Sequence, residues 1–192
     1  MFERSIMIYA FGHRSRVGKD TCVNFLETHL RMANIEVLRV SFAFELKIAT
    51  HRLFKHFGVE HPIHYENHPE DRTLVIPKLE CNVVELWIKY GNAIRNIYES
   101  IWVDLALKQD DGTAQVILIS DCRFPNEVQS IHYLGGKVYK VMRLDAPFLD
   151  SPSDAALDDF TGWDGYIMNN KTLSDLNFLM EGLANEIIQS IH

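Results

Sequence analysis

The dipeptide Gly18-Lys19 is the part of the sequence best suited to bind phosphate. It follows the apolar run at 5–11 and a polar, glycine-bearing segment, and it precedes apolar residues at helical spacing. A loop that opens a helix presents unpaired N–H groups and the positive end of the helix dipole to an anion, and a lysine there can reach phosphate oxygens. The position predicts a phosphate-binding loop, with an ordinary turn and a chance lysine as the alternative.

The loop departs from the strict pattern of glycine, four residues, and Gly-Lys-Ser/Thr. His13 occupies the first glycine position, with Gly12 one residue early, and Asp20 stands where a hydroxyl residue would contact Mg²⁺. Cations and hydroxyl groups nevertheless crowd this segment. We expect ATP phosphates to be held by the consecutive residues Arg14, Ser15, Arg16, Val17, Gly18, Lys19, Asp20 and Thr21.

A second group of charged residues follows the apolar run at 115–120, which is typical of a parallel strand covered on both faces. Asp121 lies where α/β sheets place ligands, so we expect it to hold Mg²⁺, with capping of the next helix as the alternative. Asp20 has the same two interpretations at the first helix. Arg123 emerges at the same edge, where it could clamp a phosphate, pair with Glu127, or do both.

The elements that must position these residues alternate along the chain. Apolar runs predict strands at 5–11, 36–42, 115–120, 137–143 and 165–168. Helical spacing predicts helices at 19–33, 46–57, 84–105 and 126–134 and a last one that continues to the C-terminus, capped by Thr172. The alternation implies an α/β protein with a parallel sheet flanked by helices in a single domain, 1–192.

Composition and charge narrow the class of protein. The net charge is −7, and Lys171 is the only Lys or Arg after residue 143, against nine acidic residues. An acidic chain without a basic stripe is a poor candidate for gripping a nucleic-acid polymer, whereas a small phosphorylated ligand needs only a few cations. Three cysteines without CxxC spacing favour free thiols, and no apolar stretch reaches the length that a bilayer needs. We therefore expect a cytoplasmic protein without membrane contact or targeting segment.

Three histidines, His61, His64 and His68, invite interpretation as a zinc site. Pro62 and Pro69 interrupt any helix that would align them, and no cysteine joins them. We therefore expect no zinc there.

In the loop around Lys19 and in the stretch around Asp121, the chain resembles the phage deoxynucleoside monophosphate kinases, with phosphomevalonate kinase as a more distant relative. The family's SGKDT-like loop matches 17–21, and its SD-x-RF-x-NE signature matches 119–128. Weaker matches follow in order over nearly the whole chain. They are Ser41-Phe42-Ala43 with Leu46-Lys47, the helix with Gly91, Arg95 and Trp102, the return strand with Arg143, and Asn169.

The resemblance implies a P-loop kinase fold with a helical acceptor-binding insertion at about 43–110 and a short lid at about 144–164. It implies ATP and Mg²⁺, and transfer of the γ-phosphoryl group to a deoxynucleoside monophosphate. Another phosphorylated acceptor, such as phosphomevalonate or dephospho-coenzyme A, and a catalytically weak nucleotide-binding protein are the alternatives. The expected partner is a small-molecule nucleotide, and the expected state is a monomer or homodimer in the cytoplasm of a host cell.

The resemblance also assigns roles to single residues. Catalytic roles fall to Lys19, Asp121, Arg123 and Arg143, and metal binding falls to Asp121 and Asp20. Acceptor binding falls to Phe42, Lys47, Arg95, Trp102, Arg123 and Glu127. The structural alternatives are a core position for Trp102 and a solvated surface position for Lys47, Arg95 and Arg143.

The lid-like segment at 144–164 has an unusual charge. It contains no Lys or Arg, and its H-x-S-E-like element corresponds to 151–154, which lacks the histidine. Its aspartates are Asp145, Asp150, Asp154, Asp158, Asp159 and Asp164. We therefore expect Arg14, Arg16, Arg123 and Arg143 to neutralise the phosphates, and Asp158 and Asp159 to face solvent.

Overall fold

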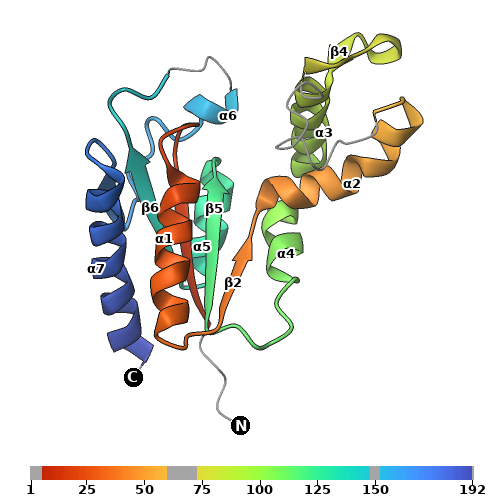
Figure 1. The fold of residues 1–192 in the computed structure, drawn as a ribbon. Helices are drawn as coiled ribbons and strands as arrows, with labels where there is room; N and C mark the ends of the chain where they lie inside the picture. The colour runs from red at the N-terminus through yellow and green to blue at the C-terminus, as the bar shows by residue number, and fades with distance from the viewer. Residues whose placement is uncertain (1–5, 60–72, 148–151, 192) are drawn as a thin grey trace. The chain divides into compact units, whose positions relative to one another are not determined.

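A computed structural model describes residues 6–59, 73–147 and 152–191 of the chain (Figure 1). The chain divides into two compact units. The first, Met1–Ser41 with Leu107–His192, contains the large sheet, and the second is Phe42–Ala106. The second unit coincides closely with the region at 43–110 that the resemblance marks as a helical insertion.

The first unit is built on a five-stranded sheet whose paired strands are all parallel. Its strands are β1 (Met7–Gly12), β2 (Val37–Val40), β5 (Val116–Cys122), β6 (Lys137–Met142) and β7 (Gly165–Met168). They lie in the order β2-β5-β1-β6-β7, so β5, β1 and β6 are interior strands with a neighbouring strand on each side. The prediction of an α/β protein with a parallel sheet flanked by helices is confirmed.

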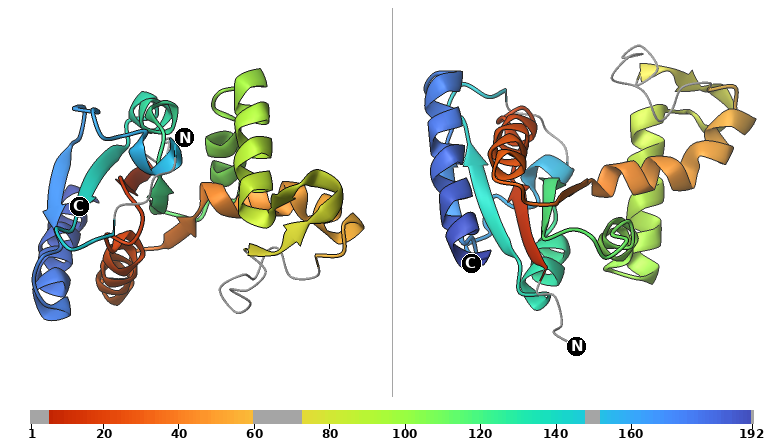
Figure 2. Two further views of the ribbon diagram at one scale, coloured as in Figure 1. Left: turned by 90° about the horizontal axis from the view of Figure 1, so that it is seen from above. Right: turned by 60° about the horizontal axis from the view of Figure 1, so that its bottom comes forward.

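Helices cover both faces of this sheet (Figure 2). On one face lie α1 (Lys19–Met32) and α7 (Leu173–Ile191), and on the other lies α5 (Pro125–Tyr133). The core between the sheet and the first pair of helices contains Phe11, Leu26, Leu118 and Met180, each at most 1% exposed. The apolar residues of α1 recur every three or four positions, which gives the helix one buried face.

The crossover helices that follow the neighbouring strands β1 and β5 lie on opposite faces of the sheet. Helix α1 follows β1 on one face, and α5 follows β5 on the other. The two connecting loops therefore diverge at the carboxyl ends of adjacent strands, which is where open α/β sheets bind ligands. Both predicted groups of charged residues, one after β1 and one after β5, lie at this point.

The cap predicted for the last helix is confirmed. Thr172 Oγ1 accepts a hydrogen bond from the backbone N–H of Asp175 at 3.2 Å, and the Asp175 carboxylate accepts one from the N–H of Thr172 at 3.1 Å. This reciprocal pair satisfies two N–H groups that the start of a helix would otherwise leave unpaired.

Two predicted elements were wrong in their bounds. The strand expected at 36–42 ends at Val40, and Phe42 already begins α2 (Phe42–His56). The helix expected at 84–105 is two helices, α3 (Val83–Ile97) and α4 (Ile101–Leu107). The chain breaks at Tyr98, whose backbone is extended, and Ser100 Oγ donates to the Asp104 carboxylate at 3.4 Å at the start of the new helix.

The second unit has its own small core. Phe54, Val83 and Trp87 pack together, and Trp87 Nε1 donates to Thr50 Oγ1 at 3.0 Å. A short antiparallel pair, β3 (Val75–Ile76) and β4 (Cys81–Asn82), encloses the 3₁₀ turn Pro77–Leu79 and was not predicted. Two-residue strands carry too little alternation to be recognised in a sequence.

The three cysteines, Cys22, Cys81 and Cys122, are buried free thiols, as predicted. Within the described part of the chain, no helix combines the length and the apolar character needed to cross a bilayer.

Candidate functional site

The loop between β1 and α1 folds back on itself through residues with left-handed backbone conformation. His13, Arg16 and Gly18 have φ angles of 95°, 59° and 98°. The first glycine of the strict pattern is therefore replaced by a histidine that adopts a conformation glycine prefers. Gly12 has another role, because a Cβ atom there would lie 2.9 Å from the ring of Trp163.

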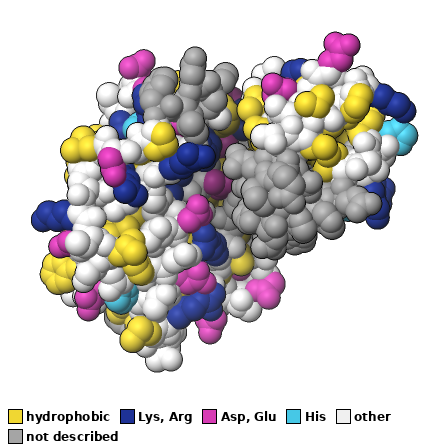
Figure 3. Space-filling view, turned by 45° about the horizontal axis from the view of Figure 1, so that its top comes forward, with side chains coloured by type: hydrophobic (Ala, Val, Ile, Leu, Met, Phe, Trp, Pro, Cys, Tyr) yellow, Lys and Arg dark blue, Asp and Glu magenta, His cyan; other side chains and the backbone are white. Residues whose placement is uncertain are grey.

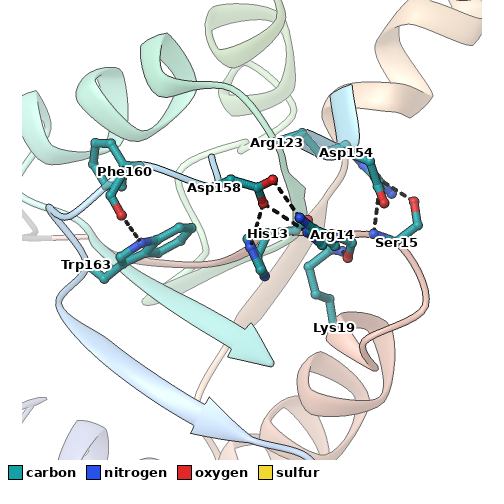
Figure 4. A network of polar contacts seen from close by, with 9 residues as sticks. All are labelled: His13, Arg14, Ser15, Lys19, Arg123, Asp154, Asp158, Phe160 and Trp163. Atoms are coloured by element: carbon teal, nitrogen blue, oxygen red, sulfur yellow. Dashed lines mark hydrogen bonds and ion pairs between the residues drawn. The ribbon is translucent and has the colours of Figure 1, made fainter. Parts of the chain in front are cut away.

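Lys19 is the first residue of α1, and the loop wraps around its ammonium group (Figure 4). Its Nζ donates to the carbonyl oxygen of His13 at 3.1 Å and to that of Arg14, and the residue is only 6% exposed. Burial, followed by the positive charge of Arg123, lowers the pKa of Lys19 to about 8. The loop therefore holds a buried cation beside its own backbone, as a phosphate site requires.

Asn169, just after β7 (Gly165–Met168), supports the loop through a side-chain hydrogen bond. Its Nδ2 donates to the carbonyl oxygen of Val17 at 2.9 Å, and its backbone N–H donates to that of Met142 at 2.8 Å. A Cβ atom on Gly18 would lie 2.3 Å from this Nδ2. Sequence reasoning found Asn169 only as a family match, because nothing local links it to a loop some 150 residues away.

Substitution of Gly18 by alanine should destabilise the protein more than the same substitution at Gly112. Both positions have similar φ angles, 98° and 88°, but nothing lies within 4 Å of a Cβ on Gly112. The left-handed backbone should cost about 1–2 kcal/mol in either variant, and displacement of the Asn169 amide from its hydrogen bond to Val17 should add about 0.5–1.5 kcal/mol at Gly18 alone. Urea unfolding of the two variants measures the difference, and equal losses would show that the Asn169 contact is not tight.

Asp121 lies at the carboxyl end of β5, and Ser41, just after β2, holds one of its oxygens. Ser41 Oγ donates to Asp121 Oδ2 at 2.8 Å. Asp121 also acts electrostatically on Lys19, whose pKa its charge raises against the dominant effect of burial. The N-cap position of α5 is Phe124, so Asp121 does not cap this helix as the alternative interpretation expected.

Asp20 lies in the first turn of α1 but points to the surface. Its side chain is 76% exposed and pairs with Arg39 of β2 at 2.9 Å. The N-cap is Gly18, without a side-chain cap hydrogen bond, so Asp20 does not cap α1 as the alternative interpretation expected. Its charge still favours the positive end of the helix dipole.

Arg123 joins the two strand ends directly. Its guanidinium donates to Ser15 Oγ at 2.8 Å and to Asp154 Oδ1 at 3.1 Å. Glu127, which is 2% exposed, accepts hydrogen bonds from the backbone N–H groups of Arg123 and Phe124 at 2.7 and 3.0 Å. The carboxylate of Glu127 therefore fixes the backbone from which the Arg123 side chain reaches the loop.

The acidic segment at 152–164, which begins with the short helix α6 (Pro152–Ala155), lies against the loop, and one prediction about it was wrong. Asp158 was expected to face solvent, but it accepts two hydrogen bonds from Arg14, at 2.9 and 2.6 Å, and lies 3.2 Å from His13 Nε2. The hydrogen bond from Arg14 lowers the pKa of Asp158. Asp159 is exposed, as expected. Sequence periodicity cannot reveal such a pair, because its members are 144 residues apart.

Trp163 packs against Gly12 of β1, and Phe160 packs against Trp163 (Figure 4). Trp163 and Phe160 meet edge to face with ring centroids 5.3 Å apart, and Trp163 Nε1 donates to the carbonyl oxygen of Phe160 at 2.8 Å. Since Trp163 packs on Gly12, the acidic segment is held at the start of the loop between β1 and α1.

Four of the predicted acceptor-binding residues lie in the second unit. Phe42 and Lys47 are in α2, with exposures of 3% and 8%, and Lys47 Nζ lies 5.7 Å from the ring centre of Trp87. Arg95 is in the last turn of α3. Trp102 is 3% exposed and donates through Nε1 to the carbonyl oxygen of Gly91 at 3.2 Å, which is a core position. Lys47 is therefore not the solvated lysine of the alternative interpretation.

The remaining loop and strand-end residues are less tightly placed. Val17 is buried, Arg16 is exposed and Thr21 is half-buried. Arg143, beyond β6, has a side chain that is 45% exposed and pairs with Asp145 at 2.6 Å. Basic and acidic side chains lie beside one another on the visible surface of the first unit (Figure 3), in keeping with its ion pairs Arg14–Asp158, Arg39–Asp20 and Arg143–Asp145.

No group of three or more His, Cys, Asp or Glu side chains suited to holding a metal occurs among residues 6–59, 73–147 and 152–191. The histidines His61, His64 and His68 lie outside the described residues. A single aspartate at Asp121 fits Mg²⁺ nevertheless, because this ion keeps several waters and is commonly bound through one or two carboxylates and the phosphates of a substrate.

Comparison of the sequence with models of known protein families and with curated proteins found no match.

Proposed function

We propose that the protein is an ATP-dependent kinase of the P-loop type that phosphorylates a small phosphorylated acceptor, with a deoxynucleoside monophosphate as the preferred acceptor. The single observation that supports this proposal best is the convergence of Lys19, Arg123 and Asp121 at the carboxyl ends of adjacent strands. A buried amine, a guanidinium and a carboxylate at one such point are the charges that transfer of a phosphoryl group requires.

Each group has a distinct task in the proposed reaction. Lys19 and the N–H groups of the loop bind the β- and γ-phosphates, and Arg123 binds the oxygens of the group in transit. Asp121 would hold Mg²⁺, which supplies neutralising charge to the phosphates. An acceptor oxygen forms the new bond to the γ-phosphorus, while the bond from that phosphorus to the bridging oxygen breaks and ADP leaves with the electron pair.

The choice of acceptor comes from the motif resemblance at 17–21 and 119–128 and not from the geometry. A different phosphorylated acceptor, such as phosphomevalonate or dephospho-coenzyme A, would use the same loop. An ADP-release assay with ATP, Mg²⁺ and a panel of nucleoside and deoxynucleoside monophosphates, together with these two acceptors, separates the candidates. ADP release that depends on a deoxynucleoside monophosphate supports the proposal, whereas release with phosphomevalonate or dephospho-coenzyme A alone contradicts the preferred acceptor.

Replacement of Asp121 by asparagine should raise the Mg²⁺ concentration needed for half-maximal activity severalfold and lower turnover. The amide keeps the shape of the side chain and still accepts the hydrogen bond from Ser41, so Tm should change little. Ser41→Ala is the matched control, because it removes the donor but keeps the charge, and its Mg²⁺ dependence should shift less. A large fall in Tm with an unchanged Mg²⁺ dependence would assign Asp121 a purely structural role.

A further inference from the structure

The donors of the phosphate loop already hold anions, and both anions come from the acidic segment. The backbone N–H of Ser15 donates to Asp154 Oδ1 at 2.7 Å, and Arg123 donates to the same oxygen at 3.1 Å. A loop N–H and a guanidinium that converge on one oxygen form a donor set suited to a phosphate oxygen. In this structure a carboxylate oxygen takes that place.

The Asp154 carboxylate is poorly satisfied in this position. Its side chain is 1% exposed, and its Oδ2 is buried without a hydrogen-bond partner within the described part of the chain. A buried oxygen of a carboxylate that lacks a donor is unfavourable. The segment is therefore held against the loop at a cost that favours its displacement by a better anion.

Asp158 covers a second cationic side chain of the loop, that of Arg14. Both of its oxygens are bound by Arg14, in the bidentate geometry that arginine also uses for phosphate, and His13 lies beside them. Asp158 is 29% exposed and Arg14 is 27% exposed, so water and dissolved anions reach this pair.

We infer that Asp154 and Asp158 act as internal competitors of phosphate, so that polyphosphate binding and docking of the acidic segment on the loop exclude each other. The inference rests on the proposed function, since it assigns the loop to phosphate. It goes further, because it makes the affinity for phosphate depend on two carboxylates that carry no part of the transfer reaction. A segment without a single Lys or Arg thereby regulates access to the loop by its negative charge.

Pyrophosphate binding by the full chain, measured by isothermal titration calorimetry, tests this inference without any transfer reaction. Asp158→Asn should bind pyrophosphate about threefold or more tightly than the unmodified protein, the size expected when a partly exposed ion pair is removed. Asp159→Asn is the matched control, because it removes the same charge from the neighbouring exposed position, and its affinity should stay unchanged. In an Arg14→Gln background, Asp158→Asn should give a smaller gain.

Asp154→Asn provides a second variant for the buried carboxylate, with Tm recorded to verify folding, and it too should bind pyrophosphate more tightly. Unchanged or weaker binding by Asp158→Asn would overturn the inference, as would an equal gain in Asp159→Asn. If either of these results is found while Lys19→Met weakens pyrophosphate binding, the loop still binds phosphate and only the proposed competition is wrong. If Lys19→Met leaves binding unchanged, or if no variant binds, both the inference and the proposed function fail.

Discussion

Replacement of Lys19 by methionine is expected to lower phosphoryl transfer by at least about a hundredfold while the protein stays folded, because a preorganised charge at the transferring group is lost. Methionine retains much of the length and apolar volume of the lysine stem in a position that is only 6% exposed. The ammonium group is the part that is removed, and with it the donors to the carbonyl oxygens of His13 and Arg14.

The protonation state of the Lys19 amine supports the expected loss of transfer in Lys19→Met. Burial lowers the pKa of Lys19 to about 8, so the amine is still mainly protonated at pH 7. A bound phosphate would favour the charged form further, because an opposite charge nearby stabilises it. Turnover of Lys19→Met with saturating ATP, together with its Tm, is the measurement, and full activity in a folded variant would mean that this loop is not the phosphate site.

Removal of the Arg123 side chain is expected to raise the barrier to transfer by about 1–3 kcal/mol, the range for a charged hydrogen bond to the phosphates. The guanidinium already reaches Ser15 of the loop, so it needs little movement to meet a phosphate held there. Arg123→Lys should recover only part of the loss, because a single ammonium cannot reproduce the fork of the guanidinium.

Arg143→Ala is the matched control for Arg123→Ala. Both arginines lie just beyond parallel strands, but Arg143 is 45% exposed and pairs with Asp145. Its charge is therefore better screened, and its removal should cost less turnover than that of Arg123. The ratio of kcat/KM in each variant to that of the unmodified protein gives the two losses. A larger loss for Arg143→Ala would show that the arginine after β6, and not the one after β5, binds the phosphates.

The sequence predicted those features that depend on local patterns. Alternation of apolar runs identified the five strands, and the strand-loop-helix order placed Lys19 correctly at the start of α1. The same reasoning placed Asp121 and Arg123 beyond β5, since parallel strands end at one edge of a sheet. Helical spacing continued across Tyr98, however, so the break between α3 and α4 could not be predicted from periodicity.

Contacts between distant segments were beyond sequence reasoning. Ser41 holds Asp121, Asn169 holds the loop at Val17, and Asp158 binds Arg14, and in each case many residues separate the partners. Aspartates in a segment without cations look like a solvated surface when only composition is considered. The structure pairs two of them with the loop because Trp163 packs on Gly12 and brings the segment there.

The most direct test of the central proposal is transfer of labelled phosphate from γ-³²P-ATP to deoxynucleoside monophosphates, with products separated by chromatography. The account predicts labelled deoxynucleoside diphosphate and ADP in equal amounts, both dependent on Mg²⁺ and both nearly lost in Lys19→Met. ATP consumption that leaves all of the label in inorganic phosphate, or labelled diphosphate formed equally by Lys19→Met, would contradict it.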